Sequence, residues 1–452
     1  MNKLKVGYGR VNIDPPLGIG IFGYYVPRYA KGFLDSLEAS ALALECDGKQ
    51  VLLISVDHLG IDTPILNRYR TTIAKECGIS PDVLYIASTH THTGAFVAPS
   101  FGFTCDPEPI RWYADLLEKR LVDVVKLALA DVKPAKMGFA LGTAPDRIAY
   151  IRRYKMKDGS TWTCPPIEDP NIDYPLGELD QRVHILRFDQ DGGESIVLMN
   201  YGLHADTIGG ELLSADWPAW TRKTVDVALG AKCMCFVGAQ GDVGSTNVHP
   251  SGGDMNDTEI SFDNEMKSPG MARFVGRALA GTILQVYDKV EYIDVDKINI
   301  LHKNVQIGAN LPKPEELPLA HKYKELHDAD RDDLIPYTAM ELTTVVAEAI
   351  RMCNLENGPD HFDLELTGVQ IGNVALIGIP GEPFTDIGVQ IKDTEGWSAI
   401  LPCCIVNGYE GYFPTKEAYD EGGYEARAST FQPDVAQKIV TGGKELLAEL
   451  KK

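Results

Sequence analysis

Short apolar runs that break into polar residues recur along the chain. The first is Val51–Val56 in KQVLLISVDHLG, and four more occur in DVLYIASTHTHTG, SIVLMNYGLHAD, KCMCFVGAQGDV and NVALIGIPGEP. A short apolar run bounded by turn residues predicts a buried strand, whereas apolar residues three and four positions apart predict a helix. The helical pattern covers residues 64–77 and the stretch RWYADLLEKRLVDVVKLALADV. Strands that alternate with helices indicate an α/β fold.

The last four runs lead directly into loops that carry chemically active side chains. These loops contain THTHTG, GLHAD, GAQGDV and PGEP. Loops at one edge of an α/β sheet lie close together, and binding sites assemble there from distant parts of the chain. We therefore expect the four loops to build one site.

Two segments depart from the alternating pattern. Residues 145–185 are rich in Arg, Pro, Asp and Tyr, and they predict a long irregular excursion of the kind that is often functional. Residues 312–358 predict two helices joined by a charged turn, which we interpret as a helical insertion and not a separate domain. No internal repeat and no linker-like composition interrupts the chain, so we expect residues 1–452 to form one large domain.

The charge of the chain excludes several classes of partner. Its 452 residues include 43 Lys and Arg and 64 Asp and Glu, which gives a net charge of −21. Phosphate binding needs basic residues on one face, so we expect no nucleic-acid partner and no polybasic contact with anionic lipid. No run of about 18 apolar residues occurs, so we expect no membrane span. A globular protein that acts on a small-molecule substrate remains, and its oligomeric state is not readable from the sequence.

The N-terminus and the cysteines bear on the compartment. The start, MNKLKVGYGRVNIDPP, has basic residues but no apolar core segment, so we expect no signal peptide and a cytoplasmic location. The nine cysteines are odd in number, scattered and without a CxxC pair. This usage predicts small core residues and not disulfides or a thiolate zinc site.

His90 and His92 stand two residues apart in THTHTG. On an extended segment, side chains two apart point to the same face. Two imidazoles at a strand end can therefore approach one metal ion, and we predict metal binding or catalysis here. The alternative is a pair of surface histidines that form hydrogen bonds with the neighbouring Thr hydroxyls.

Two further candidates follow other strands. His204 in NYGLHAD is a lone histidine, a pattern typical of a structural residue, but Asp206 and Asp216 lie nearby and can orient an imidazole through its second nitrogen. Glu382 in GIPGEPFTD is a carboxylate on a rigid turn, which can bind zinc or act as a base. The alternative for Glu382 is an acid in the first turn of a helix that begins near Thr385.

A Gly-rich loop and a group of tyrosines complete the candidates. GAQGDVGSTN follows a strand and exposes backbone N–H groups that can hold an oxyanion, but it lacks the GK[ST] ending of a phosphate-binding P-loop. The C-terminal part carries Tyr409, Tyr412, Tyr419 and Tyr424. Such tyrosines are commonly half-buried packing residues, although a phenol beside zinc can bind the metal or donate to an oxyanion.

The order of these motifs resembles the neutral/alkaline non-lysosomal ceramidase family. THTHTG comes first, then NYGLHAD with SADWPAW, GAQGDV, PGEPFTDIG and NGYEGY with YEARAST. The opening GYGRVNIDPP, GIFGY and DSLEASALAL are similar to the family's N-terminal signature, and RRYKMKDG is similar to a segment of its shorter bacterial members. The resemblance covers roughly residues 5–435.

The resemblance implies stacked mixed β-sheets flanked by helices in a single catalytic domain that binds one Zn²⁺ ion. It places the zinc ligands at His90, His204, Glu382 and Tyr424. His92 would then act beside the ligands or on the transition state. Tyr412 and Arg152 match positions that hold the substrate carbonyl or its oxyanion, and Arg147 competes with Arg152 for this role.

Three departures from the family bear on the substrate. Ceramide-cleaving members have a Ser where this chain has Gly244, and Ser245 lies one residue later. We also expect neither the C-terminal immunoglobulin-like domain of the long members nor a secretion signal. These departures argue against a long-chain sphingolipid as the substrate.

Zinc-assisted hydrolysis of an amide by activated water is the predicted reaction. Ester or lactone cleavage is an alternative, because the same site polarises any acyl carbonyl. A second alternative is a metal-dependent lyase or isomerase, with Asp206, Asp216 or Asp242 as its base. A third alternative is a zinc-stabilised binding protein that catalyses no reaction. Product mass separates these reactions, since hydrolysis adds water and isomerisation does not.

Overall fold

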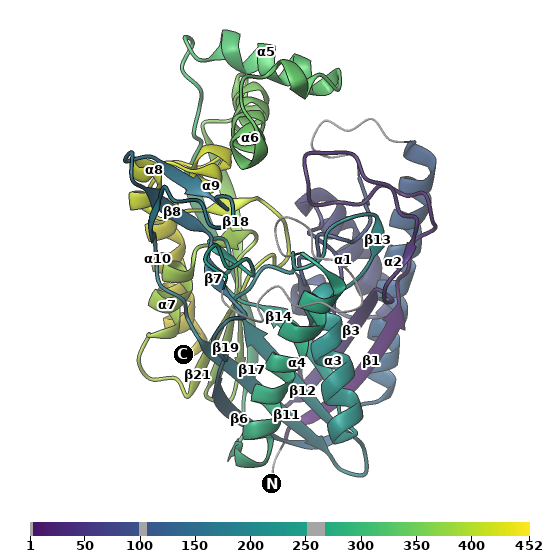
Figure 1. The fold of residues 1–452 in the computed structure, drawn as a ribbon. Helices are drawn as coiled ribbons and strands as arrows, with labels where there is room; N and C mark the ends of the chain where they lie inside the picture. Colours follow the sequence, from purple (N-terminus) through teal and green to yellow (C-terminus); the bar gives the residue numbers. More distant parts are fainter. Residues whose placement is uncertain (1–2, 99–105, 251–266) are drawn as a thin grey trace.

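Two mixed β-sheets stacked face to face form the centre of the molecule (Figure 1). The computed structural model describes residues 3–98, 106–250 and 267–452. In this part of the chain the larger sheet has nine strands, in the order β14-β12-β11-β6-β1-β3-β4-β5 with β16 beside β6. The smaller sheet has four, in the order β17-β18-β19-β21. The expected α/β fold with stacked mixed sheets is confirmed.

Most neighbouring strands in the two sheets are antiparallel, and the exceptions bear on the site. The pairs β4–β5, β12–β14 and β19–β21 are parallel. The strands of the larger sheet are β14 (Lys232–Val237), β12 (Ser195–Tyr201), β11 (Arg182–Gln190), β6 (Lys133–Thr143), β1 (Lys5–Asn12), β3 (Glu38–Cys46), β4 (Lys49–Val56), β5 (Leu84–Ser88) and β16 (Glu291–Ile293). Those of the smaller sheet are β17 (Ile298–Gly308), β18 (His361–Ile371), β19 (Val374–Gly378) and β21 (Ala399–Cys403). Each predicted apolar run is a strand.

The core lies between the sheets because their strands alternate in side-chain direction. In β3, Leu42 and Leu44 point into the space between the sheets, whereas Ala41 and Ala43 face the helical layer. On the helix side β1 is exceptionally close to a helix. A Cβ added to Gly7 would lie 2.1 Å from the carbonyl oxygen of Ala128, so glycine permits this contact.

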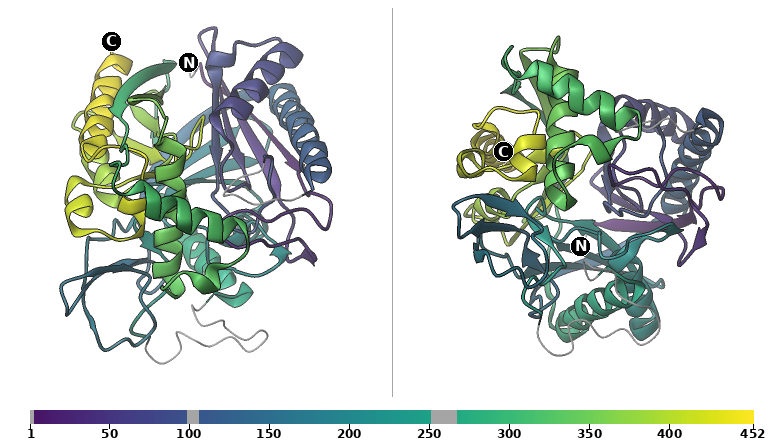
Figure 2. Two further views of the ribbon diagram at one scale, coloured as in Figure 1. Left: turned by 90° about the horizontal axis from the view of Figure 1, so that it is seen from above. Right: turned by 45° about the horizontal axis from the view of Figure 1, so that its top comes forward.

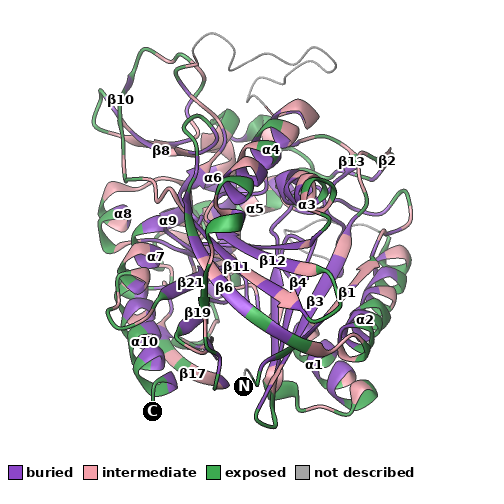
Figure 3. Ribbon diagram, turned by 90° about the horizontal axis from the view of Figure 1, so that it is seen from below, coloured by how far each residue is buried: buried purple, intermediate pink, exposed green. Residues whose placement is uncertain are grey.

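Helices cover the outer faces of both sheets (Figure 2). Helices α1 and α2 share an apolar cluster with β3 to β5, α3 and α4 with β11, β12 and β14, and α7 and α10 with the smaller sheet. Figure 3 shows buried residues concentrated in the strands and exposed residues on the outer sides of α2 and α10. These helices are α1 (Thr63–Cys77), α2 (Pro107–Ala130), α3 (Asp216–Leu229), α4 (Pro269–Val286), α7 (Thr385–Lys392) and α10 (Val435–Leu450).

Between β17 and β18 the chain forms two helices that stand apart at the top of Figure 1. They are α5 (Leu317–Asp328) and α6 (Ala339–Leu355), and they fall within the segment 312–358. They share their own small apolar cluster, against which Tyr25 from the N-terminal part packs. Helix α6 also contacts α9 (Tyr424–Ala428), since Arg427 pairs with Glu348.

The segment 145–185 is more regular than its sequence suggests. It contains β7 (Tyr150–Ile151), β8 (Arg153–Met156), β9 (Thr161–Thr163) and β10 (Ile172–Pro175), and the last three form a small sheet. The prediction of an irregular excursion was wrong because strands of two to four residues give no readable alternation. The remaining short elements are β2 (Gly32–Phe33), β13 (Leu212–Leu213), β15 (Val243–Gly244), β20 (Glu382–Pro383), β22 (Tyr412–Phe413) and α8 (Lys416–Glu421), together with three 3-10 turns at 81–83, 287–289 and 332–334.

The cysteines agree with their predicted use. The eight that lie among the described residues form no disulfide with one another, and five of them are buried. Cys105 lies outside the described residues. None of the described helices combines the length and the apolar character that crossing a bilayer requires.

Candidate metal centre

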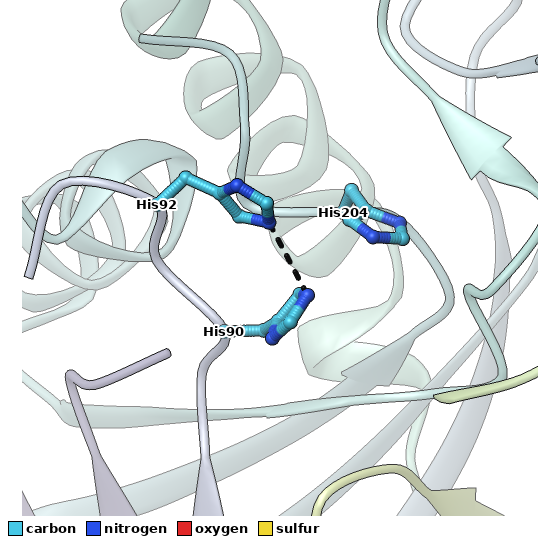
Figure 4. Close-up of side chains that lie close together, drawn as sticks. All are labelled: His90, His92 and His204. Atoms are coloured by element: carbon cyan, nitrogen blue, oxygen red, sulfur yellow. Dashed lines mark hydrogen bonds between the residues drawn. The ribbon is translucent and has the colours of Figure 1, made fainter. Parts of the chain in front are cut away.

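Three histidines from two strand-end loops meet at one point (Figure 4). His90 and His92 follow β5, and His204 follows β12. The ring centroid of His90 lies 4.8 Å from that of His92 and 4.9 Å from that of His204. All three are buried, and one nitrogen from each lies within 4.8 Å of the others. Such a group could hold a metal ion.

Backbone carbonyls fix the proton positions on two of the imidazoles. Nδ1 of His90 lies 2.8 Å from the carbonyl oxygen of Leu59, and Nδ1 of His204 lies 2.8 Å from that of Gln240 and 3.0 Å from that of Val243. A carbonyl only accepts hydrogen bonds, so each Nδ1 carries a proton. In the neutral imidazole Nε2 is then a bare lone pair. Burial, followed by the charge of Arg152, lowers the pKa of His204 to about 4, which keeps it neutral at pH 7.

Both bare nitrogens face the same carboxylate oxygen. Oε2 of Glu382 lies 3.1 Å from Nε2 of His90 and 3.0 Å from Nε2 of His204. This oxygen is buried and accepts no hydrogen bond. Two lone pairs and an anionic oxygen converge without a proton between them, and this donor set fits a divalent cation.

His92 is close to the centre but is oriented differently. Its Nε2 lies 3.3 Å from Nε2 of His90, and its Nδ1 is buried without a hydrogen bond, 3.8 Å from Oδ1 of Asp206. A Cβ on Gly23 would lie 2.8 Å from this Nδ1, so glycine allows the loop to cover the ring. With the proton on Nε2, His92 donates into the site. With the proton on Nδ1, it offers a third nitrogen ligand.

Arg152 lies between β7 and β8, and its side chain reaches the histidines. Its NH1 lies 3.4 Å from Nε2 of His204, and its NH2 donates to the hydroxyl of Tyr412 at 3.1 Å and to the carbonyl of Gly241 at 2.9 Å. Its Nε donates to Oε1 of Glu425 at 2.7 Å. Burial alone lowers the pKa of Arg152, but Tyr412 and Glu425 outweigh it and raise the pKa well above its ordinary value. The guanidinium is a fixed positive charge at the edge of the centre.

Arg147, the competing arginine, lies elsewhere. It is exposed and has a φ of 72° in the turn before β7. The structure therefore brings Arg152 to the predicted site, whereas Arg147 lies in an exposed turn.

The two candidate phenols lie beside each other. The ring centroids of Tyr412 and Tyr424 are 5.4 Å apart, and those of Tyr25 and Tyr424 are 6.5 Å apart. Tyr412 is the backbone partner of Glu382 in the parallel pair β20–β22. Burial and the charge of Glu382 raise the pKa of Tyr412 well above its ordinary value, so its hydroxyl is neutral. Tyr412 is thus linked to His204 through Arg152, and the ring of Tyr424 packs against that of Tyr412.

The carboxylates near the centre mainly accept hydrogen bonds that hold the surrounding loops in place. Asp216 accepts hydrogen bonds from the backbone and hydroxyl of Thr207, and Oδ1 of Asp242 accepts two from Thr385, each 2.8 Å long. Asp242 thereby joins the GAQGDV loop to the start of α7. The acid in the first turn of this helix is Asp386, and Glu382 lies before the helix in β20, so the alternative predicted for Glu382 was wrong. Asp206 accepts hydrogen bonds from Tyr24 and Lys267.

Gly244, where the sequence resemblance led us to expect a serine, has space for a side chain. Gly244 pairs with Tyr150 in the short ladder β15–β7. A Cβ there would meet Cβ of Arg152 at 3.6 Å, an ordinary contact. The neighbouring Ser245 is buried.

We compared the fold of the chain with solved structures. The sequence matches no family model and no curated protein. The structure of a neutral ceramidase from Pseudomonas aeruginosa superposes with a TM-score of 0.73 and 17% identity, covering 100% of this chain and 75% of that one. The chain has the neutral ceramidase fold. A second structure, of a ceramidase complexed with C2, gives a TM-score of 0.72 and 15% identity over 100% of this chain and 76% of that one.

Two residues that hold the centre together were given no specific role from the sequence. Tyr409 donates its hydroxyl to Oε1 of Glu382 at 2.9 Å, and Glu425 holds Arg152. Tyr409 belongs to the tyrosine group NGYEGY, and Glu425 directly follows Tyr424 in YEARAST. The motifs contained both residues, but no spacing rule links either one to its partner.

Proposed function

We propose that this chain is a zinc-dependent hydrolase that cleaves an amide bond in a small molecule. The observation that carries the proposal is that Nε2 of His90 and Nε2 of His204 both lie within 3.1 Å of Oε2 of Glu382, without a proton to share. Histidine and carboxylate donors are the ligands of catalytic zinc, which keeps an open position for water or substrate. The neutral ceramidase fold supports an acyl–nitrogen bond as the target.

In this proposal His90, His204, Glu382 and Tyr424 hold the ion. Tyr412 is the alternative phenol ligand, because its hydroxyl is tied through Arg152 to His204. A zinc ion held there supplies a Lewis acid for the acyl carbonyl and lowers the pKa of a water molecule to about 7.

The side chains around the ligands act on the carbonyl oxygen as negative charge develops there. Arg152 offers a fixed positive charge, and the neutral hydroxyl of Tyr412 offers a hydrogen-bond donor. His92 donates from Nε2 when its proton resides there. Donors that are held in place before the reaction stabilise an oxyanion strongly, each by about 3–4 kcal/mol.

The other reactions considered are weaker on this geometry. Asp216 and Asp242 already accept hydrogen bonds from backbone and hydroxyl donors, and these contacts argue against either carboxylate as the base of a lyase or isomerase. Ester or lactone cleavage uses the same centre and stays open. The compartment is proposed to be cytoplasmic, and residues 1–452, with the 312–358 insertion, are proposed to act as one catalytic domain.

The test is a turnover screen with matched substrates. The purified protein is loaded with zinc and incubated with a panel of N-acyl amides and with the esters of the same acyl groups. Hydrolysis yields a free acid and an amine, with the mass of one water added. The proposal expects amide turnover that stops with a chelator and returns with zinc. Turnover of esters alone, or a product of unchanged mass, would refute it.

A further inference from the structure

The two oxygens of Glu382 have different surroundings. Oε2 faces the imidazole nitrogens of His90 and His204 and accepts no hydrogen bond. Oε1 accepts the hydroxyl of Tyr409 at 2.9 Å. Glu382 itself is fully buried, so no bulk water competes for either oxygen. One oxygen of the carboxylate is thus occupied by the phenol of Tyr409, and the other is available to a metal ion between the histidines.

Packing fixes the ring that carries this hydroxyl. The ring of Tyr409 lies 6.0 Å from that of His90, on the side of the loop after β4. A Cβ on Gly60 in that loop would lie 2.5 Å from Cγ of Tyr409. The ring therefore occupies the space that only a glycine leaves. The next residue anchors the backbone, since the N–H of Glu410 donates to the carbonyl of Pro380 at 2.8 Å.

A free carboxylate can bind a metal ion through one oxygen or through both. Zinc in catalytic sites commonly takes four ligands and leaves one position for water or substrate. If both oxygens of Glu382 bound the ion, that position would be lost. An outer hydrogen bond to one oxygen prevents this and holds the other at a fixed direction.

We infer that Tyr409 is a positioning residue for Glu382: its hydroxyl holds Oε1 and so presents Oε2 alone to the metal ion. This inference rests on the proposed metal centre. It assigns to Tyr409 a part distinct from those of Tyr412 and Tyr424, which face Arg152 and Tyr25.

The direct test compares zinc affinity in two Tyr→Phe variants. Y409F removes the hydroxyl on Glu382 and keeps the ring. Y419F is the matched control, because the Tyr419 hydroxyl forms hydrogen bonds of 2.8 Å with Ser429 and with the carbonyl of Phe431, away from the histidines. Competition with a chromogenic chelator measures the affinity for zinc alone. We expect about a 10- to 100-fold loss in Y409F and no comparable change in Y419F.

A second variant moves the phenol without deleting it. Gly60→Ala forces the ring of Tyr409 aside and should also lower zinc affinity, even if Y409F folds poorly. The absorption spectrum of the cobalt-loaded protein reports coordination, and it should change in Y409F but not in Y419F.

The outcomes separate the inference from the proposed function. Wild-type affinity and an unchanged cobalt spectrum in Y409F would overturn the role of Tyr409. A wild-type protein that binds no zinc would overturn the metal centre itself. Equal loss in Y409F and Y419F would show a general effect on folding and would also overturn the inference.

Discussion

Glu425 and Arg152, which lie 273 residues apart in the chain, are joined by a hydrogen bond of 2.7 Å from Nε of the guanidinium to Oε1 of the carboxylate. Glu425 is fully buried on α9, and its other oxygen accepts the hydroxyl of Thr163 at 2.7 Å. With Nε held, NH2 of Arg152 is directed to the hydroxyl of Tyr412. One buried carboxylate thus sets the direction of the charge that faces the centre.

Replacement of Glu425 by Gln should therefore reduce turnover without removing the metal. The amide keeps the shape of the side chain but loses the charge that fixes Arg152, and misplacement of a catalytic group by about 1 Å can cost about 100-fold in rate. We expect a loss of this order in kcat with unchanged zinc content. E421Q is the control, since Glu421 on α8 pairs with Arg153 at the surface side. Full activity of E425Q would contradict the assigned role.

His92 is expected to act on the reaction and not on the metal. H92A should keep its zinc and lose about 100- to 1000-fold in rate, as for the removal of one oxyanion donor. Metal analysis and kinetics on the same preparation check this. Loss of zinc from H92A would instead make His92 a third nitrogen ligand, with its Nδ1 proton directed to Asp206.

The two neighbouring phenols can be told apart in the same way. Y424F should lower zinc affinity, because Tyr424 is the proposed ligand, whereas Y412F should bind zinc normally and turn over slowly. Equilibrium dialysis against zinc and a steady-state rate for each variant provide the comparison. The reverse result would identify Tyr412, the backbone partner of Glu382, as the ligand.

The sequence predicted that these loops meet at one site, because each strand is recognisable as a short apolar run. The runs that became β5, β12, β14 and β19 are apolar and end in His, Asp, Gly or Glu, and the parallel pairs β4–β5 and β12–β14 bring their ends to one edge. His90, His204 and Glu382 meet there as expected. Which of the neighbouring residues bind the ion is still a prediction.

The sequence did not predict the contacts between residues that lie far apart in the chain. Glu425 reads as an ordinary acid in the first turn of a short helix, yet it is buried against Arg152. Tyr409 reads as one more packing tyrosine, and its hydroxyl direction depends on Gly60. Local periodicity carries no information on such pairs, and the short strands near Arg153 are too brief to show any periodicity at all.

A histidine remote from the centre should make the fold sensitive to acid. His184 on β11 is buried, and its Nδ1 has no hydrogen-bond partner. Burial, followed by the charge of Lys392, lowers its pKa to about 3. Between an unfolded-state pKa of about 6.5 and this value the unfolded chain binds the extra proton, so the free energy of unfolding falls as the pH falls through that window.

The variant H184Q cannot take up this proton. In urea unfolding from pH 7 to 4, with a chelator present, it should lose less stability than the wild type, by up to about 1.4 kcal/mol per pH unit. His302, which is partly exposed and paired with Glu365, serves as the control in H302Q. Identical pH profiles for H184Q and the wild type would show that His184 is not buried in its neutral form.

The metal content of the purified protein tests the central claim most directly. Elemental analysis after zinc loading and dialysis should find about one zinc ion per chain in the wild type, and almost none in H90A, H204A and E382Q, with turnover lost in the same three variants. A wild type without bound metal, or a variant that keeps both its zinc and its full activity, would contradict the account.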